Sequence, residues 1–173
     1  GTLGHADKTG NDTFGSLTIE SGGTAIATSG TTTITSETSG GFAMVDQGTF
    51  THNNGTVQIG DGSTAVGSGT HTKVDTFYNL TVNMSASSVD AILRPNSGST
   101  VTVANDLTVT QGEVYRNNVS DTLTVTGDVD IAANGTLGRT NDTGATNFGS
   151  LTIASGGTYQ ATSGTTTITN ETS

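Results

Sequence analysis

Short segments in which apolar and polar residues alternate follow one another along almost the whole chain. Nine of them are SLTIE, TTTIT, GTFTH, TVQIG, NLTVN, STVTV, DLTVT, TLTVT and DVDIA, and all but TTTIT and GTFTH have apolar residues two positions apart. Because successive side chains of a strand point to opposite faces, this alternation predicts short strands that bury one face. The expected inward pairs are Leu17/Ile19, Val57/Ile59, Leu80/Val82, Val101/Val103, Leu107/Val109, Leu123/Val125, Val129/Ile131 and Leu151/Ile153.

An internal repeat links the two ends of the chain. Residues 1–39 align without gaps on residues 135–173, an offset of 134, with 28 identities that include FGSLTI and ATSGTTTIT. The differences fall mainly on polar pairs such as His5/Arg139 and Lys8/Asp142, so we expect these positions to face solvent. Ile26 is Gln160 in the C-terminal repeat segment and is not expected in the core.

The repeat distinguishes between two architectures that short strands can form. A β-sandwich closes on itself in about 100 residues, whereas a longer period that restarts in phase requires each copy to stack on the last. We therefore predict an all-β fold, a parallel β-helix (β-solenoid) with about three short strands per coil and no significant helix. At roughly 22 to 27 residues per coil, one period makes about five or six coils, and residues 1–173 form a single continuous solenoid segment.

Composition supports strands and excludes several function classes. The chain has 38 Thr, 13 Val and 8 Ile, which suit a pleated surface, and 25 Gly against one Pro, which suits frequent turns with few interrupted ladders. It has no Cys, which excludes disulfides and thiolate metal sites. A net charge of −10 with only five basic residues argues against nucleic acid as a partner, and no apolar run is long enough for membrane insertion.

Several stretches carry a family resemblance. GTFTHNNGTV (residues 48–57), TFYNLTV (76–82), LTVTQG (107–112) and TLTVTGDV (122–129) resemble the coils of large prokaryotic surface β-helix proteins, namely filamentous-haemagglutinin-like adhesins and autotransporter passengers. This resemblance implies an exported, right-handed parallel β-helix that serves as a stalk or in adhesion. The function expected is a structural repeat module of an extended extracellular fibre, stalk or adhesin at the cell surface, and not an enzyme. Its partners would be other copies stacked end to end, and glycans or host cell surfaces.

Two alternative functions remain open. A phage tail fibre or glycan-processing β-helix would need acidic residues, for which Asp128 and Asp130 are the candidates; with Val129 and Ile131 inward, both are expected to face solvent. A ligand- or ice-binding solenoid would use the repeated Thr-x-Thr motifs. The landmarks Leu80, Leu107, Leu123 and Leu151 are unevenly spaced, which argues against one flat Thr array and favours Thr as a solvated strand residue.

Other candidate sites are single residues or short segments. Asn79, Asn83 and Asn118 lie in N-x-S/T sequons and are candidate glycosylation sites. The Asp/Gly-rich residues 60–69 are a candidate Ca²⁺ segment, and no other cofactor is expected. The aromatic residues are expected in the core: Phe14, Phe42, Phe50, Phe77, Tyr78 and Phe148.

Overall fold

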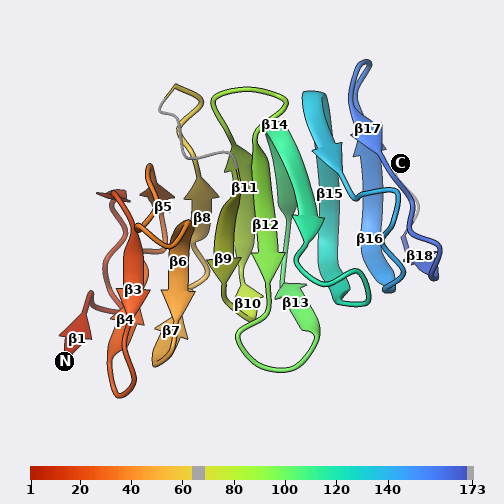
Figure 1. The fold of residues 1–173 in the computed structure, drawn as a ribbon. Helices are drawn as coiled ribbons and strands as arrows, with labels where there is room; N and C mark the ends of the chain where they lie inside the picture. The colour runs from red at the N-terminus through yellow and green to blue at the C-terminus, as the bar shows by residue number, and fades with distance from the viewer. Residues whose placement is uncertain (64–68, 171–173) are drawn as a thin grey trace.

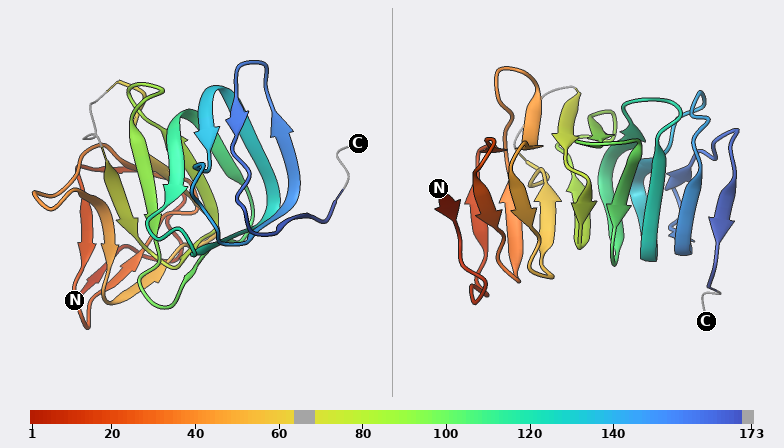
Figure 2. Two further views of the ribbon diagram at one scale, coloured as in Figure 1. Left: turned by 45° about the vertical axis from the view of Figure 1, so that its right-hand side comes forward. Right: turned by 90° about the horizontal axis from the view of Figure 1, so that it is seen from below.

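The structure, a computed structural model, describes residues 1–63 and 69–170 and is a parallel β-solenoid of about seven turns. Its coils stack from one end of the molecule to the other, and the two termini lie at opposite ends (Figures 1 and 2). Over the described ranges there is no helix, and hence none that could cross a membrane. The predicted fold class is confirmed, and each of the nine alternating segments overlaps a strand.

Three ladders of parallel strands run along the solenoid and are called faces 1, 2 and 3. Face 1 consists of β2 (Asp12–Phe14), β5 (Thr31–Ile34), β8 (Thr56–Ile59), β11 (Asn79–Asn83) and parts of β14 (Leu107–Arg116), β15 (Thr122–Leu137) and β16 (Thr146–Ile153). Face 2 consists of β3 (Leu17–Ile19), β6 (Phe42–Asp46), β9 (Thr70–Lys73), β12 (Asp90–Arg94), the ends of β14 and β15, and β17 (Thr158–Tyr159).

Face 3 is formed by the strands between face 2 and face 1 in chain order. They are β1 (Thr2–Leu3), β4 (Thr24–Ile26), β7 (Thr49–Thr51), β10 (Thr76–Phe77), β13 (Thr100–Val103), the starts of β15 and β16, and β18 (Thr166–Ile168). Among the described strands, no ladder pairing joins β7 to β10, but His52 and Tyr78, which follow these strands, stack with ring centroids 5.5 Å apart. Each coil therefore contributes one strand to each face.

Coil length varies, and the corners absorb the variation. On face 1, Asp12 is the register partner of Thr32 and Leu80 is the partner of Leu107, so the second of these coils is clearly the longer. The strands nevertheless remain in register, because the extra residues lie in the turns between faces. Thr81 and Thr108 are therefore direct partners on face 1, and Thr102 and Thr124 are partners on face 3. Gln58 and Asp130 flank the face 1 pair in the same row, so these Thr residues do not form the single flat array that the sequence argued against.

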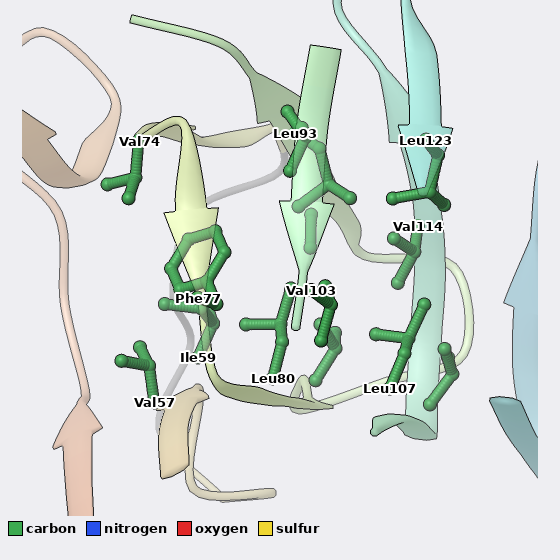
Figure 3. Close-up of a cluster of buried hydrophobic side chains, with 14 of the residues drawn as sticks. Val57, Ile59, Val74, Phe77, Leu80, Leu93, Val103, Leu107, Val114 and Leu123 are labelled. Atoms are coloured by element: carbon green, nitrogen blue, oxygen red, sulfur yellow. The ribbon is translucent and has the colours of Figure 1, made fainter. Parts of the chain in front are cut away.

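The core is a continuous column of apolar side chains inside the coils. Figure 3 shows its middle part, with side chains from several coils gathered between the faces. Six of the eight predicted inward pairs are fully buried: Val57/Ile59, Leu80/Val82, Val101/Val103, Leu107/Val109, Leu123/Val125 and Val129/Ile131. Leu17 and Leu151 are only half-buried and Ile153 is 44% exposed, because they lie in the coils near the two ends.

Some polar residues also point into the solenoid. Thr28, Thr32, Thr70, Thr72 and Thr146 are buried, so the expectation of Thr as a solvated strand residue is wrong for these five. Thr28 satisfies its hydroxyl by donating to the Lys8 and Gly10 carbonyls of the preceding coil. A β-branched side chain fits the inward face in size and shape. The hydroxyls of Thr32 and Thr72 are buried with no hydrogen-bond partner among the described residues.

The two repeat segments pair in the same register but on different faces. Thr2 and Leu3 pair with Thr24 and Ala25, as their equivalents Thr136 and Leu137 pair with Thr158 and Tyr159. However, β2 lies on face 1, whereas its equivalent at the start of β16 lies on face 3. Following the register partners along face 1 from Asp12 for six turns leads to Leu151. The repeat equivalent of Asp12 is Thr146, which comes before Leu151 in the chain and lies on face 3. One repeat period thus falls one face short of six turns.

Candidate functional site

Ionisable and aromatic side chains gather along face 2, most of them on its outer side, whereas Arg116, the register partner of the core residue Leu93, is buried. Lys73, Arg94, Arg116 and Arg139, four of the five basic residues, lie on or just after its strands on successive coils. Arg94 is the register partner of Lys73, and Arg116 is the partner of Leu93, next to Arg94. We call these four residues and the groups they contact the face 2 cluster, and it is the candidate site.

A buried ion pair lies at the C-terminal end of the cluster. Arg116 donates from Nη2 to Asp142 Oδ2 at 2.9 Å, and from Nη1 to Thr146 Oγ1 at 2.9 Å and the Ala145 carbonyl at 3.2 Å. Both partners of the pair are at most 3% exposed. The expectation that the Lys8/Asp142 position faces solvent is therefore wrong for Asp142, because Arg116 from the preceding coil covers its carboxylate.

A second group of contacts extends the cluster towards β12. The Arg139 guanidinium lies 4.3 Å from the Tyr115 ring centroid and 3.8 Å from Asp142 Oδ1, and the Tyr115 hydroxyl donates to Asp90 Oδ2 at 2.9 Å. Burial, followed by the hydrogen bond to Asp90, raises the pKa of Tyr115 to about 12. The pKa of Glu113 is also raised, first by burial and then by its hydrogen bond with Asp90. These contacts join three successive coils.

At the other end of the cluster, rings stack along the axis. The Phe42 and His71 rings are 5.3 Å apart, and the Arg94 guanidinium is 5.8 Å from the Phe42 centroid. Burial, and then the charge of Arg94, lowers the pKa of His71, although Glu37 opposes the shift. Phe42 and Tyr78 were expected in the core; both are half-buried outside it, whereas Phe77 and Phe148 are core residues and Phe14 and Phe50 pack against the core.

Within the described part of the chain, the cavity at the cluster is too small for a substrate. The cavity that touches Tyr115 and Arg116 has a volume of about 10 Å³, room for about one water molecule. Among the described residues, no three or more His, Asp or Glu side chains come together as metal ligands. The ring faces and guanidinium groups are engaged with one another across coils. These side-chain contacts therefore hold successive coils together, in the same way that cross-strand pairs stabilise a sheet.

The candidate acidic residues lie elsewhere. Asp128 and Asp130 are on the part of β15 that belongs to face 1, and both are exposed. Asp128 accepts a hydrogen bond from Ser150 Oγ at 2.6 Å and donates from its backbone nitrogen to Asp106 Oδ1 at 2.9 Å. Neither carboxylate belongs to the face 2 cluster.

The candidate glycosylation sites differ in accessibility. Asn79 is half-buried, and its side-chain oxygen accepts hydrogen bonds from Asn105 Nδ2 at 2.8 Å and from the Asp106 backbone nitrogen at 3.1 Å. Asn83 is half-buried on β11, whereas Asn118 is exposed in the turn after β14. Asn118 is therefore the most accessible of the three.

The candidate Ca²⁺ segment is described only in part, because residues 64–68 lie outside the described residues. At its start, Asp61 Oδ1 accepts hydrogen bonds from the backbone nitrogen of Ser63 at 2.9 Å and from Ser63 Oγ at 3.1 Å. These bonds are those of a polar turn.

The face 2 cluster was not predicted from the sequence, although a signal was present. Lys73, Arg94, Arg116 and Arg139 are almost evenly spaced along the sequence, and the spacing corresponds to one coil. In a chain with five basic residues, such a spacing places one cation per coil at one edge of a solenoid.

Comparison with protein-family models, with curated proteins and with solved structures finds no match. Fold and surface chemistry therefore carry the functional argument.

Proposed function

We propose that this chain is a structural repeat module of an extended extracellular fibre, stalk or adhesin, as its resemblance to filamentous-haemagglutinin-like adhesins and autotransporter passengers implies. One observation carries the proposal: the two repeat segments, at opposite ends of the sequence, pair in identical register within one solenoid. Each added period would lengthen the same core by about 27 Å, at about 4.8 Å per coil.

The chemistry of the surface supports a structural role. The face 2 cluster places Arg94, Arg116 and Arg139 in contacts between coils, which stiffen the stack, and the net charge of −10 keeps an exposed fibre soluble. An open-ended stack of coils is also the architecture in which stability adds coil by coil as length increases.

Immunogold labelling tests the location and the fibre together. Antibodies raised against this chain should label intact cells of the source organism, with gold particles along filaments that project from the surface. Labelling that requires permeabilised cells would contradict the proposal.

The glycan-processing alternative has its own test. The double variant Asp128→Asn, Asp130→Asn should keep the stability of the parent within about 0.5 kcal/mol, since both side chains are exposed. Reducing-end release from a panel of polysaccharides should be absent for both proteins. Release by the parent that the double variant loses would favour the enzyme.

A further inference from the structure

The C-terminal end of the solenoid exposes side chains that the N-terminal repeat segment buries. Ile19 and Ile34 are 4% and 0% exposed, whereas their equivalents Ile153 and Ile168 are 44% and 50% exposed. β6 pairs with the strand of Ile19, and β8 pairs with the strand of Ile34. No described strand pairs with the outer edge of the strands of Ile153 and Ile168. The comparison shows directly what one further coil covers.

The N-terminal end is complementary in shape. Leu3 is 48% exposed, whereas its equivalent Leu137 lies beside β14 and is 2% exposed. A cavity of about 170 Å³ opens at this end, and its apolar lining includes Leu3, Phe14, Leu17 and Phe50. One end of the molecule thus presents apolar side chains, and the other presents an apolar hollow.

We propose that a second molecule of this chain docks head to tail, with its N-terminal coil stacked on the C-terminal coil of the first. This inference rests on the proposed function and names its partner. At each end, each face has one strand whose outer edge pairs with no described strand: β2, β3 and β1 at one end, and the end of β16, β17 and β18 at the other. Stacking continues all three parallel ladders when the second molecule is turned by one face, so that β1 follows the end of β16, β2 follows β17 and β3 follows β18. Leu3 then covers the strand of Ile153, and β3 covers Ile168.

The contact is the same kind that holds neighbouring coils together within the chain. Because the two ends differ, the interface is heterologous and does not close, so it produces open filaments. Both molecules carry a charge of −10, and this repulsion is screened by salt. Association should therefore strengthen as ionic strength rises.

Two variants, each blocking one end, test the arrangement by sedimentation velocity over a concentration series. Leu3→Asp places a charge at the N-terminal end and Ile168→Asp at the C-terminal end, and both side chains are exposed in the single molecule, so folding is retained. Each variant alone should associate at least about tenfold more weakly than the parent, because docking would bury the new carboxylate. An equimolar mixture should form a dimer and nothing larger, since each variant keeps one working end.

The control is Val119→Asp. Val119 is 41% exposed and lies between β14 and β15, away from both ends, so this variant should associate like the parent. A parent chain that keeps its circular-dichroism spectrum but stays monomeric would overturn the docking proposal, as would a Leu3→Asp variant that still self-associates alone. Either result leaves the proposed function to be judged by surface labelling.

Discussion

At the scale of single residues, the two repeat segments place opposite charges at the same position and satisfy both. Lys8 pairs with Asp12 within its own repeat segment, whereas Asp142 pairs with Arg116 from the preceding coil. This position tolerates a side chain of either charge because its ion-pair partner can come from a different coil. The environments also differ: the Lys8 side chain is 46% exposed, whereas Asp142 is fully buried.

This difference predicts unequal effects on stability. Asp142→Leu leaves Arg116 buried without its anion and should lower the free energy of unfolding by about 3–5 kcal/mol. Lys8→Leu removes a partly exposed pair and should cost about 1 kcal/mol or less. Urea unfolding of both variants gives the comparison. Addition of Arg116→Leu to Asp142→Leu should recover much of the loss, and a double variant no more stable than Asp142→Leu would contradict the pairing.

His71 gives a prediction for pH. Because its pKa in the folded chain is below the ordinary 6.5, the unfolded chain binds the proton first as pH falls. This contribution to stability is therefore complete above pH 6.5 and is lost as pH falls from 6.5 towards the folded pKa. NMR titration should show His71 titrating below 6.5, and His71→Gln should remove the slope of stability in that window. A His71 pKa at or above 6.5 would refute the assignment.

At the scale of single elements, one corner occurs twice with the same geometry. Gly4 and Gly138 are equivalent, with φ of +88° and +95°, and a Cβ at either would clash with a carbonyl oxygen of the next coil, that of Ile26 or Gln160. Only glycine turns this corner so close to the neighbouring coil.

Substitution at this corner should therefore be costly. Gly138→Ala should lower the free energy of unfolding by about 1–3 kcal/mol, through strain at positive φ and the displaced coil. Gly10→Ala is the matched control, because a Cβ at Gly10 meets nothing within 4 Å. Thermal unfolding of the two variants tests the corner, and equal midpoints would contradict it.

The sequence predicted the strands of faces 1 and 3 better than those of face 2. Faces 1 and 3 contain LTV-type segments whose alternation is visible, whereas β9 reads THTK and buries Thr70 and Thr72 with no apolar residue to mark its inward side. In β6, the register shift between Phe42 and Met44 breaks the alternation. The face 2 cluster was missed for a related reason. Its partners, such as Asp90 and Tyr115, meet only when coils of unknown length are stacked.

At the scale of the whole molecule, the repeat period and the coil do not match. Since one period falls one face short of six turns, equivalent strands move to the preceding face. In an array with this period, successive copies would be turned by about one third of a turn, and any surface patch would appear on all three sides of the fibre after three copies.

The central claim is that each period extends one rigid solenoid, and a tandem chain tests it most directly. Three copies of residues 1–134 joined in frame and followed by residues 135–173 can be imaged by cryo-electron microscopy beside the single chain. We predict one unbroken rod, longer by about 27 Å for each added copy at about 4.8 Å per coil, with equivalent strands displaced by one face from copy to copy. Separate globules joined by flexible segments, or a rod whose length does not increase with copy number, would contradict the account.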